Sequence, residues 1–102
     1  MDLGGSIEDQ LTKEEKRLVR TLNKIADEAP IAESCIGTAM NVSAAAVKYN
    51  LFGVVRCFRE AMRVNAEGSR LNTTFHDVWC YEYNGKVWAV DPDSPDKVYR
   101  VE

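Results

Sequence analysis

The sequence predicts an α+β fold in which N-terminal helices pack on a small antiparallel β-sheet. Apolar residues recur at helical spacing in the first half of the chain, whereas β-branched and aromatic residues dominate the second half. The dipeptide Asn84-Gly85 joins two strand patterns in that second half, which is a strong signal for a β-hairpin. A chain of 102 residues has room for one domain, which we place over 1–102.

The first helix is predicted over residues 11–30. Thr12 is followed three positions later by Glu15, which is the pattern of a capping box at a helix N-terminus. Apolar positions then recur at helical spacing with charges on the opposite face, and Pro30 ends the helix. Residues 1–10 are polar and contain glycine, so we expect a flexible N-terminal segment.

A second helix is predicted over residues 34–50 and contains Cys35 at its start. Its apolar stripe includes several alanines, and small side chains allow a helix to lie close to a sheet. A strand is expected from about Gly53, because the run LFGVVRCF is β-branched and aromatic. The segment that follows, REAMRV, is compatible with either strand or helix.

The antiparallel sheet is predicted to occupy residues 53–102. After a loop at 65–73, the runs FHDVWCYEY and KVWAVD form two strands, and VYRV forms a short last strand after a turn at PDSPD. Side chains alternate between the two faces of a strand. Because Trp79 and Cys80 are neighbours, we expect one of the two to be exposed.

Composition argues against several classes of function. A net charge of −3 and a pI near 5.2 oppose a nucleic-acid partner, and no apolar run is long enough to cross a membrane. The three cysteines form no Cys-x-x-Cys pair and the chain has one histidine, which opposes a disulfide framework and a zinc site. Reduced thiols and the lack of a signal-peptide pattern indicate a cytoplasmic protein without metal or other cofactor, while secretion as an effector stays open.

Three residues predict a nucleophilic site. Cys35 lies at the expected start of the second helix, where the helix dipole favours a thiolate and free N–H groups can hold an oxyanion. His76 lies near the start of one strand and Asp91 ends the next. Counting outward from Asn84-Gly85 places these two side chains diagonally on one face of the sheet. We therefore predict Cys35 as the nucleophile, His76 as the base and Asp91 as the group that orients the histidine.

Two segments resemble a known superfamily of cysteine enzymes. HDVWCYEYNGKVWAVDPD resembles the His-to-Asp hairpin of transglutaminase-like and papain-fold toxin domains, and SCIGTAMNVSAAAVKYNLFGVVRCF resembles their nucleophile helix with the strand after it. The resemblance covers about residues 33 to 93. It implies a papain/transglutaminase-like core and thiol acyl chemistry on amides of a protein or peptide substrate. The reactions implied are peptide hydrolysis, deamidation, crosslinking and amide transfer.

One element of that superfamily is missing from this chain. Papain-like enzymes place a glutamine shortly before the nucleophile as an oxyanion donor, and the matching stretch EAPIAES has none. The Cys35 backbone N–H would then act with another group, for which Asn41 and Asn72 are the candidates. Trp79 is a candidate substrate contact that would also shield the thiol from water.

Two other classes of function stay open. One is a non-catalytic protein-binding module that keeps the papain-like fold, such as an inhibitor, an immunity protein or a phage accessory protein. Cys35 is then a small buried residue, His76 a structural histidine and Asp91 the start of a turn. The other is a structural domain that oligomerises through the edge of its hairpin.

Overall fold

In the computed structural model, which describes residues 11–59 and 75–101, two helices precede four strands. The helices are α1 (Lys13–Glu28) and α2 (Cys35–Val47), and the strands are β1 (Val54–Arg59), β2 (Phe75–Tyr83), β3 (Lys86–Val90) and β4 (Val98–Arg100). The expectations for the N-terminal segment, for REAMRV beyond its first residue and for the loop at 65–73 lie outside the described residues.

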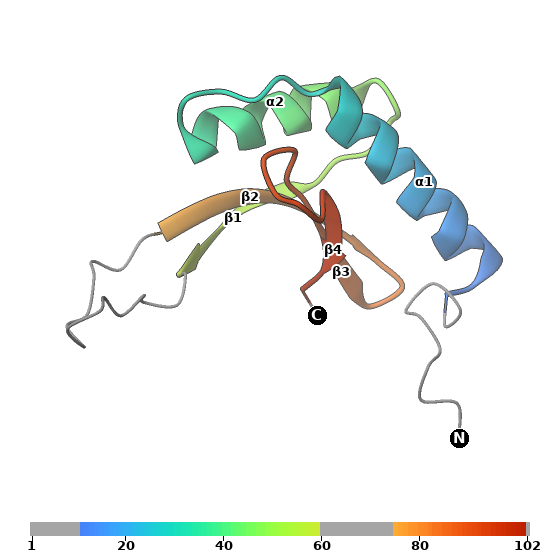
Figure 1. The fold of residues 1–102 in the computed structure, drawn as a ribbon. Helices are drawn as coiled ribbons and strands as arrows, with labels where there is room; N and C mark the ends of the chain where they lie inside the picture. Colours follow the sequence, from blue (N-terminus) through green and yellow to red (C-terminus); the bar gives the residue numbers. More distant parts are fainter. Residues whose placement is uncertain (1–10, 60–74, 102) are drawn as a thin grey trace.

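The strands form one antiparallel sheet in the order β1-β2-β3-β4, and both helices lie over the same face of it (Figure 1). The predicted α+β class, with helices packed on an antiparallel sheet, is confirmed. Helix α2 packs mainly on β2, a central strand of the sheet, so the start of α2 lies above the strand that carries the histidine.

Helix α1 begins where the capping-box pattern predicts. Thr12 Oγ1 accepts the N–H of Glu15 and Glu15 Oε1 accepts the N–H of Thr12, each at 3.1 Å. The apolar stripe buries Leu22 and Ile25 completely. Glu15 is buried as well, and its second oxygen, Oε2, lies 2.7 Å from the Lys86 ammonium nitrogen at the start of β3. This ion pair connects the first turn of α1 to the hairpin.

Helix α2 carries no charged side chain, and its apolar residues surround it on all sides. The side that faces the sheet is rich in alanine, which lets the helix approach β2 closely; its buried apolar residues are Ala39, Val42, Ala45 and Ala46. The other side exposes Ile36, Met40 and Val47. A helix of this kind is ordinarily covered on more than one side.

The β2–β3 hairpin has the geometry that its Asn-Gly turn predicts. Asn84 and Gly85 both adopt positive φ, at 55° and 72°, as a type I′ turn requires. Tyr83 pairs with Lys86 directly beside the turn, and the same register continues outward along both strands. This register is the one from which the diagonal relation between the histidine and the aspartate follows.

The central part of β2 is buried on both faces of the sheet, which corrects one prediction. Trp79 and Trp88 lie in the core beneath the helices, whereas Val78 and Cys80 belong to a second apolar cluster on the opposite face. Trp79 is 0% exposed and Cys80 is 4% exposed, so the expectation that one of them is exposed is wrong. The alternation of the strand is as predicted, but further apolar side chains also pack against the second face, namely Phe58, Tyr99 and Val101.

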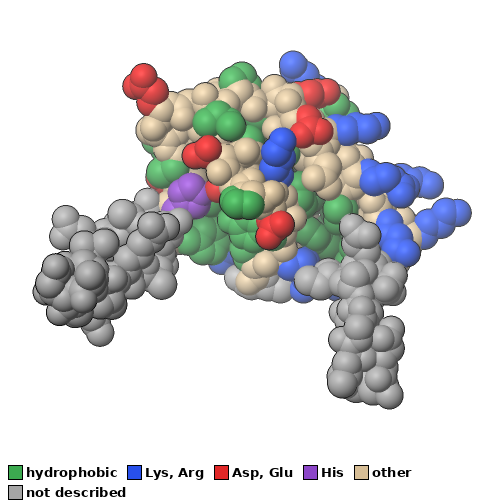
Figure 2. All heavy atoms as spheres, viewed as in Figure 1, with side chains coloured by type: hydrophobic (Ala, Val, Ile, Leu, Met, Phe, Trp, Pro, Cys, Tyr) green, Lys and Arg blue, Asp and Glu red, His purple; other side chains and the backbone are tan. Residues whose placement is uncertain are grey.

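Basic side chains lie mainly away from the histidine on the surface of the molecule (Figure 2). Lys and Arg side chains gather at one side of the molecule, where α1 runs, away from the single histidine of the chain (Figure 2). Within the described ranges, neither α1 nor α2 has the length and apolar character needed to span a bilayer.

Candidate active site

Cys35 is held at the first position of α2 by the residues around it. Ser34 caps the helix, since its side chain accepts the Gly37 N–H at 3.1 Å and its carbonyl accepts the Thr38 N–H at 3.1 Å. The Thr38 hydroxyl in turn accepts the Ala32 N–H at 2.9 Å, which fixes the loop before the helix. A side chain at Gly37 would come within 2.9 Å of the Ala32 Cβ, so the loop and helix are closely packed.

The Cys35 thiol contacts β2 at Asp77. Its Sγ lies 3.5 Å from the Asp77 Oδ2 and 3.5 Å from the Asp77 backbone nitrogen, whose N–H points at the sulfur. β3 makes its last pairing through Val90, opposite Trp79. The Asp77 N–H therefore has no β3 partner, and the thiol occupies that direction.

His76 and Asp91 are in direct contact. His76 Nε2 lies 2.6 Å from Asp91 Oδ2, so the contact that the hairpin register predicts is present. Asp91 is buried, and its Oδ1 accepts the Asp93 N–H at 3.1 Å, while its own N–H donates to the Lys97 carbonyl at 2.8 Å. An ionised carboxylate only accepts hydrogen bonds, so it selects the tautomer with the proton on Nε2. The Nδ1 of His76 is then the nitrogen free to accept a proton.

The contact between Cys35 and Asp77 and the contact between His76 and Asp91 are connected by the peptide bond between His76 and Asp77. The sulfur contacts the Asp77 nitrogen, which is bonded to the His76 carbonyl carbon, so Sγ lies within about 6 Å of the His76 Cα. Strand alternation places the side chains of His76 and Asp77 on opposite faces of the sheet, but the backbone N–H of Asp77 lies in the plane of the sheet. The thiol therefore reaches the backbone of β2 from the side that carries the Asp77 carboxylate, which is opposite to the face of His76. In the described part of the chain no hydrogen bond joins Cys35 to His76.

A second thiol lies across the strand from Asp77. Cys57 on β1 is the cross-strand partner of Asp77 and is exposed. Its pKa is raised above the ordinary value of a thiol, first by partial desolvation, then by a hydrogen bond to the Asp77 carboxylate and by the negative charges of Asp77 and Cys35. Asp77 is thus the acidic group between two cysteines.

Oxyanion donors are available at the start of α2. Because Ser34 engages the N–H groups of Gly37 and Thr38, the N–H groups of Cys35 and Ile36 are the first two of the helix without a partner among residues 11–59 and 75–101. Asn41 donates its side-chain N–H to the Pro30 carbonyl at 2.9 Å, so it braces the loop before the helix. Asn72, the other side-chain candidate, lies outside the described residues.

The expectation that Trp79 contacts a substrate is wrong. The side chain has no exposed surface and belongs to the core beneath the helices, where its ring stacks on Tyr81 with centroids 6.0 Å apart. Trp79 is close to His76 in the sequence, but its side chain lies on the face of β2 that the helices cover. We therefore assign Trp79 to the core.

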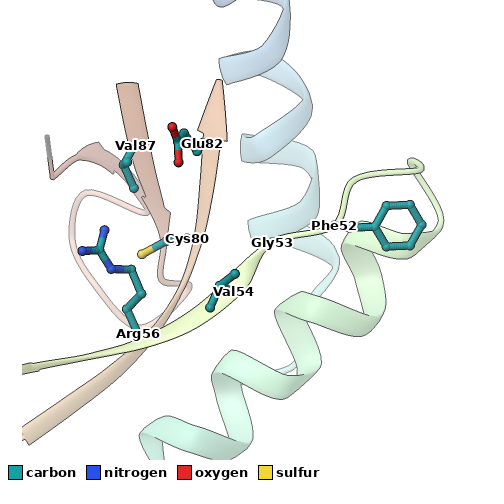
Figure 3. Close-up of a pocket in the computed structure, with 7 residues that line it drawn as sticks. All are labelled: Phe52, Gly53, Val54, Arg56, Cys80, Glu82 and Val87. Carbon is teal, nitrogen blue, oxygen red and sulfur yellow. The ribbon is translucent and has the colours of Figure 1, made fainter. Parts of the chain in front are cut away.

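A groove of about 440 Å³ lies on the sheet face away from the helices, and it does not include the three predicted catalytic residues (Figure 3). It is lined near β1 by Phe52, Gly53, Val54 and Arg56 and on the neighbouring strands by Cys80, Glu82 and Val87. No group of three His, Cys, Asp or Glu within the described ranges is placed to hold a metal ion.

Sequence reasoning missed Asp77. The residue lies next to the histidine in the sequence, which is a signal, but alternation on β2 turns its side chain to the other face. Its contact with Cys35 depends on where β3 stops pairing and on where α2 rests on the sheet. Neither of these follows from a local sequence pattern.

Comparison with known proteins adds no relative, because no family model, curated protein or solved structure matches the chain.

Proposed function

We propose that the chain is a cysteine-dependent enzyme of papain/transglutaminase-like core that transfers or hydrolyses the acyl group of an amide. The observation that carries this proposal is the 2.6 Å contact between His76 and Asp91 next to a thiol at a helix start. In enzymes with a thiol nucleophile a carboxylate fixes the tautomer of an imidazole and the imidazole takes the thiol proton, and the proposal assigns these roles to Asp91, His76 and Cys35. A protein or peptide amide is the proposed substrate.

Each residue has one role in the proposed reaction. The proton of the Cys35 thiol moves to His76 Nδ1, and the sulfur forms a bond to the carbonyl carbon. The N–H groups at the start of α2 stabilise the resulting oxyanion. The carbon–nitrogen bond then breaks, the leaving amine takes the proton from His76, and the acyl group remains on Cys35. Water or an amine next attacks this thioester, giving hydrolysis or transfer.

The resting structure requires one local movement before this reaction. The thiol is bound to Asp77, so its Sγ has to turn from the Asp77 carboxylate toward Nδ1 of His76. Hydrogen bonds of catalytic groups are often long without substrate and shorten in the complex. Because Sγ already contacts the Asp77 nitrogen, which is bonded to the His76 carbonyl carbon, we infer that the change involves the side chains of Cys35 and His76.

Alkylation of each cysteine by iodoacetamide, followed by mass spectrometry over a range of pH, tests the proposal. We expect Cys35 to react faster than Cys57 below neutral pH and to slow by about tenfold or more in His76→Gln, because a neutral amide cannot take the thiol proton. Asp93→Asn is the matched control, since it changes an exposed residue beside the same turn. An unchanged Cys35 rate in His76→Gln would remove the histidine from the site.

A second candidate function is a non-catalytic protein-binding module. It is favoured by the uncharged helix α2, which exposes Met40 at 60% of its surface together with Ile36 and Val47. The partner would be a protein with an apolar surface of its own. If Cys35 shows the reactivity of an ordinary thiol in the experiment above, this second function becomes the better account.

A further inference from the structure

The nucleophile of the proposed site lies against a carboxylate that the proposed reaction does not use. Asp77 Oδ2 is 3.5 Å from the Cys35 sulfur, on the side opposite the histidine face of β2. A substrate whose carbonyl carbon reaches the sulfur therefore places its neighbouring groups within a few bond lengths of this negative charge.

Among the side chains that the structure describes, Asp77 takes part in no ion pair. The described ion pairs are Glu15 with Lys86, Asp27 with Lys97 and Asp91 with His76, and none includes Asp77. The other acidic groups nearest in the chain to the site are Glu33, which is exposed, and Asp91, which is engaged by the histidine. A carboxylate thus lies in contact with the sulfur that the substrate has to reach.

We propose that Asp77 is a specificity-determining residue that selects substrates with a cationic group, an ammonium or a guanidinium, next to the reacting carbonyl. This inference rests on the proposed function of Cys35 as a nucleophile. Asp77 takes no part in bond making or breaking. It attracts the cation, and the cation replaces the thiol as the hydrogen-bond donor to the carboxylate. Binding such a substrate frees the sulfur to turn toward His76.

The test uses three methanethiosulfonate reagents of similar size that carry an ethylammonium, a hydroxyethyl or a sulfonatoethyl group. The full chain carries Cys57→Ser, so that the reaction at Cys35 is read by intact mass without interference from the thiol across the strand. A cysteine in an unstructured peptide provides the reference ratio of rates. We expect the ratio of cationic to neutral rates at Cys35 to exceed the peptide ratio by about tenfold, the effect of one charge at close range. The sulfonate should react more slowly than the neutral reagent.

Asp77→Asn in the same background should return the ratio to that of the peptide, whereas Asp93→Asn should leave it unchanged. Raising the salt concentration should lower the ratio in the protein with Asp77 intact, which tests the charge without a further substitution. The inference would be overturned if the ratio of cationic to neutral rates at Cys35 equals that of the peptide. It would also be overturned if a raised ratio persists in a folded Asp77→Asn protein.

The same experiment separates this inference from the proposed function. If the neutral reagent slows in His76→Gln but no cationic preference is seen, the enzyme proposal stands and the role of Asp77 is rejected. If the preference depends on Asp77 but the neutral rate does not depend on His76, the nucleophile lacks its base. The enzyme proposal and the substrate class both fail in that case.

Discussion

His76 Nε2 and Asp91 Oδ2 lie 2.6 Å apart although the two residues belong to different strands and are 15 positions apart in the sequence. The turn at Asn84 and Gly85 fixes this relation, since its register pairs Trp79 with Val90 and leaves the histidine and the aspartate as a diagonal pair just beyond. Orientation of the imidazole is thus a consequence of hairpin geometry.

Asp91→Asn should lower the reactivity of Cys35 more than it lowers the stability of the fold. The asparagine oxygen can still accept the Asp93 N–H, so we expect the free energy of unfolding to fall by less than about 1 kcal/mol. An amide does not enforce the Nε2–H tautomer, so alkylation of Cys35 should slow by at least about tenfold. Urea unfolding and alkylation rates measure the two effects. If the folded variant has a clearly lower free energy of unfolding but an unchanged alkylation rate at Cys35, Asp91 serves the turn alone.

Local sequence signals predict much of this fold. The capping box of Thr12 and Glu15, the positive φ values at the hairpin turn and the strand register each depend on a few adjacent residues. The contact between His76 and Asp91 belongs to the same group because one tight turn connects the two strands. Because these features depend on residues close together in the sequence, they can be predicted without knowing how distant elements pack.

Contacts between distant elements were not predictable in the same way. Cys35 contacts Asp77 because α2 rests on β2, and these residues are 42 positions apart. Cys80 is buried because side chains beyond its own hairpin cover the second face of the sheet. The sequence pattern of β2 specifies that its side chains alternate between the two faces of the sheet, but it does not specify which residues cover either face.

Asp77→Asn should also change Cys57, whose pKa is raised by desolvation and by the Asp77 carboxylate. Removing the carboxylate should lower the pKa of Cys57 toward its ordinary value without restoring it fully, because desolvation remains. At a fixed pH near 8 the fraction of thiolate rises, so Cys57 should be alkylated faster than in the unmodified protein. Mass spectrometry of the peptide that contains Cys57 gives the rate, and Glu82→Gln on the same strand serves as the control. A slower reaction would contradict the assigned cause.

The ion pair between Glu15 and Lys86 should make stability depend on pH. Hydrogen bonds to Glu15 from Lys86 and from the Thr12 N–H hold the pKa of this carboxyl below its ordinary value. A carboxyl whose pKa is lower in the folded state contributes stability above its unfolded pKa of about 4.3 and loses it as the pH falls through the folded value. The urea midpoint should therefore decrease on acidification below about pH 4.3, and Glu15→Gln should reduce this decrease.

Glu14→Gln provides the matched control for that measurement. Glu14 precedes Glu15 in the same turn of α1 but is exposed and has no described ion pair. Its substitution should leave the acid dependence of the urea midpoint nearly unchanged. Equal effects of the two substitutions would attribute the pH dependence to the charge of the helix N-terminus in general and would contradict a specific role of Lys86.

Gly53→Ala should destabilise the fold by about 1–3 kcal/mol because the position before β1 has no space for a side chain. A Cβ there would lie 2.3 Å from the Cys80 carbonyl oxygen and 2.4 Å from the ring of Trp79, which is itself fully buried and cannot move aside. Gly85→Asn is the control: Gly85 has positive φ, which asparagine tolerates, and no atom lies within 4 Å of the added Cβ. Urea unfolding should show a clear loss for Gly53→Ala and a small change for Gly85→Asn. Equal losses would mean that backbone conformation, and not the contact with Trp79, decides the effect of these glycines.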